Sequence, residues 1–198
     1  MAQAYSTAFQ QNFSYIKTKR ASRSTGLTPY SGQWTSKEVI HLLKRTMFGA
    51  AKQDITHFLS MNVTTAVDEL LTASATAPNP PLNAYNDTNY TDPNVPLGQT
   101  WVNAAYDNNA NGRRVASLKA WWVGLQLNQG GSIEEKMTLF WHNHFATGYS
   151  KIAGVVGTND GARLMDARAT TDAGGQQGQV ELFRKMAVGK FSDLLLEI

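Results

Sequence analysis

Two histidines separated by a single residue are the side chains in this sequence best suited to chemistry. His142 and His144 flank Asn143 within the stretch EKMTLFWHNHF. Imidazole titrates near neutral pH and binds metals readily, so histidine serves both as a general base and as a ligand. We therefore consider His142 and His144 as candidate catalytic residues and as candidate ligands of a divalent metal ion.

The backbone around this pair decides whether the two rings can cooperate. Successive residues of an α-helix are turned by about 100°, which places His144 on the apolar face and His142 roughly opposite. On a β-strand both rings would share one face and could chelate one ion. The spacing of Ser132 and Glu135 matches a capping box and favours a helix that begins near Ile133. On that helix His144 is either a hydrogen-bonded core residue or a single ligand or base, and His142 lies on the outer face.

Glu38 and His41 could supply the rest of a metal site. Their spacing is Glu-x-x-His, which helix bundles use to hold metal ions between facing helices. With His144, these two residues would form a two-helix site. Glu38 is also spaced to form a capping box with Thr35, which would occupy its carboxylate. The sequence leaves both interpretations open.

The stretch from Asp107 to Gly112 resembles the first half of a calcium-binding loop. It reads D-x-N-x-N-G, so Asp107, Asn109 and Asn111 would supply oxygen ligands before the turn. The position that should hold a bidentate glutamate is Leu118, and two arginines follow the stretch directly. An Asn-Gly turn that caps the following helix is therefore the favoured interpretation.

Residues 72–112 form a long loop rich in proline and asparagine. Its proline density excludes helices, and a loop of this length is usually functional or mobile. We expect Trp101 to be exposed, whereas the spacing of Trp121, Trp122 and Trp141 predicts helical core positions. The candidate binding residues of the loop are its aromatic and polar side chains: Tyr85, Tyr90, Trp101, Tyr106, Asp107, Asn109 and Asn111.

The elements that would position all of these residues are helices. No convincing alternating strand pattern is present, so we expect a mainly α, multi-helical, bundle-like domain. Residues 1–33 carry no sustained period and are expected to be a flexible arm. Residues 34–198 are expected to be the N-terminal part of one larger helical domain, because the last segment is apolar and lacks a cap. The predicted helices span residues 34–49, 51–60, 64–73, 113–128, 133 onwards, 180–189 and 191–198, with a short helix around 162–168.

The composition excludes several classes of protein. The chain of 198 residues is 42% hydrophobic and contains no cysteine, which excludes disulfides and cysteine-based zinc sites. Its net charge of +3 is too small and too dispersed to favour nucleic-acid binding. No apolar run approaches the roughly 20 residues that span a bilayer. The N-terminus also lacks the apolar centre of a secretory signal.

Five segments together resemble a bacterial family, domain of unknown function 1800. The resemblance covers about residues 34–198, and its most specific part is EKMTLFWHNHF at 135–145, supported by Arg184, Gly189 and Phe191. It implies a large, mainly helical domain without a settled biochemical role, in which many members carry export signals. This chain shows no such signal, and it ends before a downstream acidic and asparagine-rich motif of the family. The matching segments are HLLKRTMFG, AVDELL, SLKAWWVGLQLNQ, EKMTLFWHNHFAT and LFRKMAVGKFSDLLLEI.

Two functions from different classes agree with these observations. The favoured one is a non-catalytic, exported or envelope-associated helical protein that binds a partner or polymer, because no complete catalytic constellation is visible. The alternative is a metal-assisted hydrolase that uses His142 or His144 with acidic residues from a C-terminal half that this chain lacks. The lean towards export or the cell envelope comes from the family resemblance alone.

Overall fold

The chain folds into helices connected by loops. The structure, a computed structural model, describes residues 28–74, 77–146 and 178–198. These residues contain seven α-helices and no β-strand, apart from an isolated antiparallel bridge between Leu82 and Thr100. The prediction of a mainly α chain is therefore confirmed. All seven helices belong to one compact unit, Gln33–Ile198, which is distinct from Met1–Gly32. The helix expected around 162–168 lies outside the described residues.

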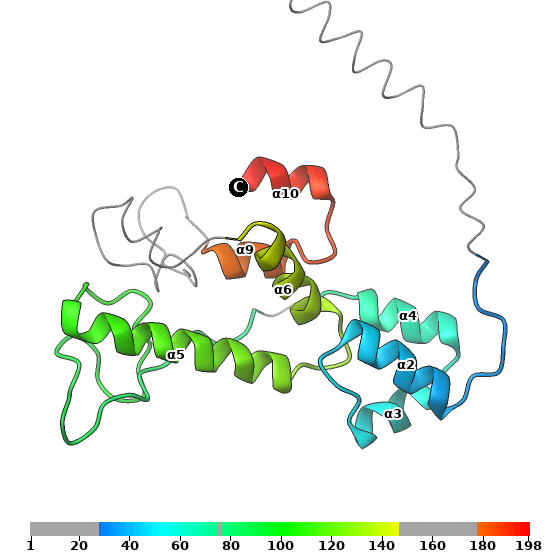
Figure 1. The fold of residues 1–198 in the computed structure, drawn as a ribbon, viewed down its shortest axis with the longest axis horizontal. Coiled ribbons are helices and arrows are strands. Elements are labelled where there is room, and N and C mark those ends of the chain that lie inside the picture. The colour runs from blue at the N-terminus through cyan, green and yellow to red at the C-terminus, as the bar shows by residue number, and fades with distance from the viewer. Residues whose placement is uncertain (1–27, 75–76, 147–177) are drawn as a thin grey trace, which may run out of the picture. The chain divides into compact units, whose positions relative to one another are not determined.

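The first three helices share an apolar core. They are α2 (Ser36–Thr46), α3 (Lys52–Leu59) and α4 (Val63–Leu71), shown in blue to cyan in Figure 1. The predicted capping box is present, because the backbone N–H of Thr35 donates to the Glu38 carboxylate at 3.2 Å. Helix α4 is capped by Asn62, whose side chain accepts from the Thr65 N–H. Their core comprises Val39, Leu43, Met47, Phe58, Ala66 and Leu70.

Helix α5 (Asn108–Leu127) begins five residues before the predicted start at 113. The Asp107 side chain accepts hydrogen bonds from the N–H groups of Asn109 and Ala110, at 2.9 and 2.8 Å, and so caps the helix. Asn109 and Asn111 therefore lie in helical backbone, which cannot wrap alternate oxygens around an ion. Neither the half calcium loop nor the Asn-Gly turn is formed, because the N-cap extends the helix through both.

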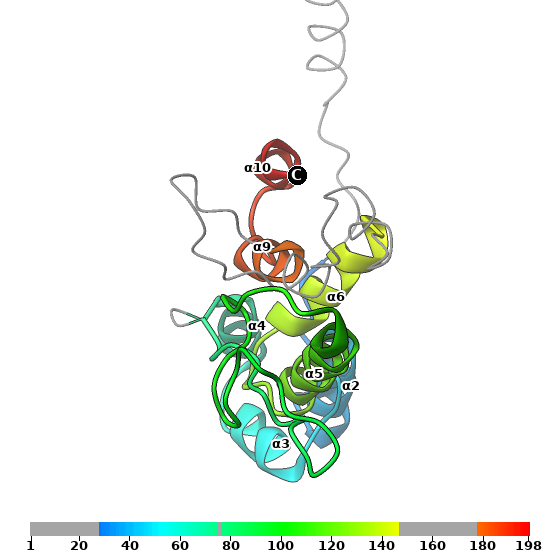
Figure 2. The same ribbon diagram turned by 90° about the vertical axis from the view of Figure 1, so that its left-hand side faces the viewer.

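Helix α6 (Glu134–His144) packs against α9 (Gln179–Lys185), and both views in Figures 1 and 2 show the two side by side. A buried ion pair joins them: Arg184 donates through Nε and Nη2 to the two Glu135 carboxylate oxygens, at 2.6 and 3.1 Å. Glu135 is therefore not the partner of Ser132 in a capping box. Ser132 Oγ accepts the Glu134 N–H, at 3.1 Å, and the predicted box is wrong because Arg184 binds the Glu135 carboxylate.

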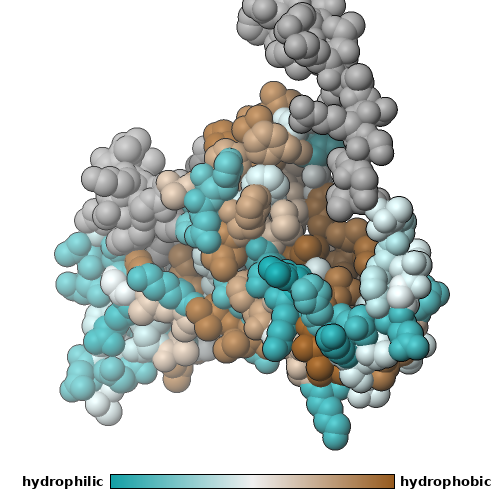
Figure 3. Space-filling model, turned by 45° about the vertical axis from the view of Figure 1, so that its right-hand side comes forward, coloured by the Kyte–Doolittle hydropathy of each residue, from teal (hydrophilic) through white to brown (hydrophobic). Residues whose placement is uncertain are grey.

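The last helix, α10 (Phe191–Glu197), buries one leucine and exposes others. Leu194 packs with Leu182 and Phe183 of α9, whereas Leu196 is 87% exposed. Brown residues at the top of Figure 3 mark this apolar surface. No helix in the described part of the chain combines the length and apolar character that crossing a bilayer requires.

Residues 77–107 of the long loop pack on α5. Val95, Trp101 and Val102 are buried and form a second core cluster with Leu118 of the helix. The loop folds back on itself through the Asn83 side chain, which donates to the Val95 carbonyl at 2.7 Å. The proline-rich loop is thus a packed layer on one helix, and this layer positions the site described next.

Candidate functional site

The burial of the two α6 histidines is the reverse of what we predicted. His144 is exposed, and its ring stacks on Phe140 with a centroid separation of 6.1 Å and an interplanar angle of 12°. His142 is partly buried and meets the Trp122 ring edge-on at 5.1 Å. The outer-face assignment of His142 and the core assignment of His144 are therefore wrong. The two rings do not form a chelating pair on this helix.

A polar inner face on α6 explains the reversal. The buried residues of this helix are Glu135 and Thr138, and His142 follows them at helical spacing. Burial lowers the pKa of His142 below its ordinary value, which favours the neutral ring. Its Nδ1 atom is buried and has no hydrogen-bond partner among the described residues. The apolar pattern predicted the opposite orientation of α6, because it assigns the charged Glu135 to the solvent side. Glu135 is buried instead because it pairs with Arg184.

The described residues do not assemble the predicted two-helix metal site. Glu38 is engaged in the capping box of α2, and His41 is exposed on the same helix. No group of three or more histidine, aspartate or glutamate side chains in the described ranges is placed to hold a metal ion. Glu38, His41, His142 and His144 are therefore not gathered into one centre within this part of the chain.

The aromatic residues predicted as the binding loop make contacts within the fold. Trp101 is only 1% exposed and donates from Nε1 to Ser117 Oγ at 3.1 Å, so the expected exposed aromatic is a core residue. The Tyr106 hydroxyl donates to Asn108 at the start of α5. Tyr85 and Tyr90 are partly buried and lie close to Arg113. Of the predicted set, only Tyr85 lines the cavity described below.

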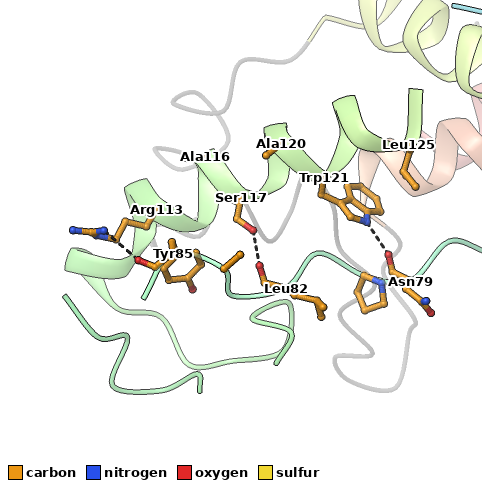
Figure 4. Close-up of a pocket in the computed structure, with 11 residues that line it drawn as sticks. Asn79, Leu82, Tyr85, Arg113, Ala116, Ser117, Ala120, Trp121 and Leu125 are labelled. Carbon is orange, nitrogen blue, oxygen red and sulfur yellow. Dashed lines mark hydrogen bonds between the residues drawn. The ribbon is translucent and has the colours of Figure 1, made fainter. Parts of the chain in front are cut away.

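We call residues 77–85 the strap. A groove of about 770 Å³ lies between the strap and α5 (Figure 4). Most of its wall is apolar, with Tyr85 and Trp121 as its aromatic members. Arg113 is the one charged side chain among the described residues that line it. The full lining is Asn79, Pro80, Leu82, Ala84, Tyr85, Arg113, Ala116, Ser117, Ala120, Trp121 and Leu125.

Three side chains of α5 hold the strap in place. Arg113, Ser117 and Trp121 are spaced four residues apart, so they form one stripe along the helix. Each donates a hydrogen bond to a backbone carbonyl oxygen of the strap, and Figure 4 shows the three bonds in a row. The bonds run from Arg113 to Tyr85 at 3.3 Å, from Ser117 to Leu82 at 2.8 Å and from Trp121 to Asn79 at 2.7 Å.

A buried ion pair behind the strap fixes the Tyr85 ring. Arg114 donates to Asp92 through Nε at 3.0 Å and through Nη2 at 3.2 Å, and the Tyr85 hydroxyl donates to Asp92 Oδ2 at 2.8 Å. Burial alone would raise the pKa of Asp92, but hydrogen bonds from Asn94, Tyr85 and Arg114 outweigh it and lower that pKa. Burial and the bond to Asp92 raise the pKa of Tyr85, so its hydroxyl stays protonated. Tyr85 is therefore a rigid wall of the groove.

The opposite end of the groove is fixed by Trp121. The Arg184 guanidinium lies over the Trp121 ring at 5.4 Å from its centroid, a cation–π arrangement. Arg184 is itself held by Glu135, so α6 and α9 support this side of the groove. The ring is thus set by one contact to its face and one hydrogen bond from its Nε1.

Sequence reasoning did not identify the groove, because its two walls are separated along the chain. The spacing of Arg113, Ser117 and Trp121 was the one available signal. The lining contains no carboxylate, histidine or lysine in the described residues, so it offers no acid–base pair for catalysis. A mostly apolar cavity with one fixed cation is instead suited to binding.

Comparison with known proteins places the chain in a family. A family model described as "Protein of unknown function (DUF1800)" matches residues 41–198. The chain therefore belongs to the DUF1800 family, as its sequence motifs indicated. No curated protein and no solved structure matches the chain.

Proposed function

We propose that this member of the DUF1800 family is a non-catalytic binding protein that holds a partner or polymer of the cell envelope in the groove between α5 and the strap. The observation that supports the proposal is the groove itself. Its volume of about 770 Å³ lies within the range of roughly 300–1,000 Å³ that is usual for ligand sites. Its walls are set by hydrogen bonds and by the Asp92–Arg114 pair, so the site exists before any ligand binds.

The absence of an acid–base pair in the lining supports binding over catalysis. Hydrolysis needs a base, a nucleophile or a metal-bound water at the reacting atom. The hydroxyl groups of Ser117 and Tyr85 are engaged with Leu82 and Asp92, and the described residues of the lining include no histidine. The groove therefore has the means to recognise a molecule but not to activate one.

A blocked groove tests the proposal. In Ala120→Phe the new ring would occupy the groove, because Ala120 lines it and is exposed. Lys119→Phe adds the same ring at the preceding position of α5, which is outside the lining, and serves as the matched control. We would immobilise both variants and the wild type, apply detergent-solubilised cell envelope, and quantify retained lipids and polysaccharides by mass spectrometry.

We expect the wild type and Lys119→Phe to retain one class of envelope molecule at least about tenfold above Ala120→Phe, a difference of roughly 1.4 kcal/mol. Equal retention by all three proteins would show that the groove is not the binding site. Circular dichroism of each variant verifies that the helices are intact.

The envelope location is a separate part of the proposal. It is supported by the resemblance to a family in which many members carry export signals. Fractionation of cells that express the natural gene, followed by detection of the protein in the envelope and cytoplasmic fractions, tests it. Recovery in the cytoplasmic fraction alone would refute the location without affecting the groove.

The Nδ1 atom of His142, which has no hydrogen-bond partner among the described residues, supports a second candidate function, a metal-assisted hydrolase. A buried neutral imidazole nitrogen without a hydrogen-bond partner is a suitable metal ligand or base. The described residues supply no second and third ligand beside it. The hydrolase therefore requires acidic groups from other residues, which makes it the weaker proposal.

Metal content measured by mass spectrometry on protein purified without chelator or affinity histidines tests this candidate. About one zinc, iron or manganese ion per chain, lost in His142→Ala and kept in His57→Ala, would support it. His57 is the control because it is an exposed histidine paired with Glu69. Less than a tenth of an ion per chain would exclude it.

A further inference from the structure

We propose that the part of the partner that enters the groove is a hydrocarbon chain ending in a carboxylate, as in a fatty acid. The chain would lie along Ala116, Ala120 and Leu125, and the carboxylate would bind Arg113. This inference rests on the proposed binding role of the groove.

The hydrogen-bonding groups of the groove favour a hydrocarbon over a peptide. Ser117 and Trp121 already donate to the strap, and the Tyr85 hydroxyl already donates to Asp92. An extended peptide would bring one N–H and one C=O per residue. Among the described lining residues only the side chains of Asn79 and Arg113 are free to pair with these groups, so most of them would lose water without gaining a partner. A hydrocarbon chain carries no such groups, so only apolar surface is removed from water.

The charge of the groove favours an anionic end group. Arg113 is the one charged side chain among its described lining residues, and 38% of that side chain is exposed. Its Nη1 atom makes two long bonds, to the Tyr85 carbonyl at 3.3 Å and to Asp87 at 3.4 Å. Its Nε and Nη2 atoms make no hydrogen bond to the described residues. The planar fork of a guanidinium matches one carboxylate, whereas a doubly charged phosphate would call for a second cation.

Asp87 does not need Arg113 to remain ionised. Its Oδ1 atom accepts the backbone N–H groups of Asn89 and Tyr90 at 2.8 and 2.9 Å. The bond from Asn89 is the main reason that the pKa of Asp87 is lowered. Asp87 is also exposed to water, so Arg113 can turn to a ligand without leaving a buried charge behind.

The Tyr90 ring holds the guanidinium while its edge stays accessible. The Arg113 guanidinium carbon lies 4.3 Å from the centroid of that ring, a cation–π contact that engages the face of the group. From Arg113 to Leu125 the helix rises by roughly 18 Å, at about 1.5 Å per residue. The groove therefore has a fixed cation at one end and an apolar track of acyl-chain length.

Isothermal titration with three ligands of equal chain length tests the inference. Decanoate, decanol and decyl phosphate, all below their micelle concentrations, would be titrated into the wild type, Arg113→Gln and Lys119→Gln. Lys119→Gln removes one positive charge from α5 outside the groove lining and is the matched control. We expect decanoate to bind the wild type and Lys119→Gln at least about tenfold more tightly than decanol does.

In Arg113→Gln this preference should disappear, while decanol keeps most of its affinity because Ser117 and Trp121 still hold the strap. Equal affinity of the wild type for decanoate and decanol, or an unchanged preference in Arg113→Gln, would overturn the inference. Tighter binding of decyl phosphate than of decanoate would overturn the assignment to a carboxylate. A peptide with an apolar C-terminal tail would be titrated as a fourth ligand, and tighter binding of this peptide than of decanoate would assign the groove to a polypeptide instead of a hydrocarbon.

The two proposals fail in different ways. If decanoate does not bind but Ala120→Phe still abolishes retention of envelope material, the ligand class is wrong and the binding role stands. If decanoate does not bind the wild type and Ala120→Phe retains as much envelope material as Lys119→Phe, both proposals fail.

Discussion

We expect loss of the buried ion pair between Asp92 and Arg114 to destabilise the groove wall more than loss of any other contact described above. Side-chain exposure is 0% for Asp92 and 3% for Arg114, so neither charge is solvated by water. In Asp92→Ala the Arg114 guanidinium would stay buried without its counter-ion. Breaking one side of such a pair costs about 3–5 kcal/mol. Because whole domains are stable by only about 5–15 kcal/mol, the variant should lose a large share of its stability.

Urea denaturation followed by tryptophan fluorescence measures this cost. The control is Asp87→Ala, which removes an exposed carboxylate of the same loop and should cost far less than Asp92→Ala. The double variant Asp92→Leu with Arg114→Met removes both charges and should recover most of the lost stability. It also keeps the test valid if Asp92→Ala does not fold.

A loss below about 1 kcal/mol in Asp92→Ala, equal to that in Asp87→Ala, would refute the reasoning. It would mean that the loop is not anchored on α5 by this pair. The Tyr85 ring would then lack a fixed position, and the groove would not be a preformed site.

Further predictions concern the pH dependence of stability and the aromatic residues. The folded pKa of Asp92 is lowered, so its contribution to folding stability is complete above the unfolded pKa of about 3.9 and is lost as pH falls through the lower folded pKa. Acid titrations of the wild type and Asp92→Asn, followed by circular dichroism, should differ in this range. The folded pKa of His142 is also lowered, so stability should fall as pH drops below about 6.5, and His142→Gln should lack this step in chemical denaturation at stepped pH. His144→Ala should change the free energy of unfolding by less than about 0.5 kcal/mol, since the ring is exposed. A loss above about 2 kcal/mol would show that the ring is part of the core. Trp101→Ala should cost about 3–5 kcal/mol in urea denaturation, and a near-neutral effect would contradict its burial.

The helices were predictable because their signals are local. The Thr35 and Glu38 capping box lies within one turn and forms as expected. The start of α5 was misplaced because Asn111 and Gly112 were interpreted as a turn before the helix, although the Asp107 side chain caps the helix five residues earlier. An Asn-Gly pair occurs both in turns and within a helix, and only the position of the N-cap distinguishes the two.

The inner face of α6 was not predictable from its own sequence. Glu135, Thr138 and His142 are polar, and an amphipathic pattern assigns them to solvent. They face inward because Arg184, 49 residues away, neutralises Glu135 in the interior. A single sequence without contact information carries no signal for that pairing.

The burial of Trp101 and the existence of the groove have the same origin. Trp101 donates a hydrogen bond to Ser117, and the strap accepts hydrogen bonds from Ser117 and its neighbours on the same stripe of α5. A proline-rich loop gives no periodicity from which its packing face could be read. The sequence indicated that residues 72–112 were important but not that they cover α5.

Amide hydrogen exchange with and without solubilised cell envelope tests the central claim, that the groove is a ligand-binding site, most directly. In the wild type we expect slower exchange on addition of envelope material, by at least about tenfold, for strap amides of residues 82–85 and amides of residues 113–125. The same experiment on Ala120→Phe should show no slowing there. Slowing confined to α6 and α10, or equal slowing in Ala120→Phe, would contradict the account.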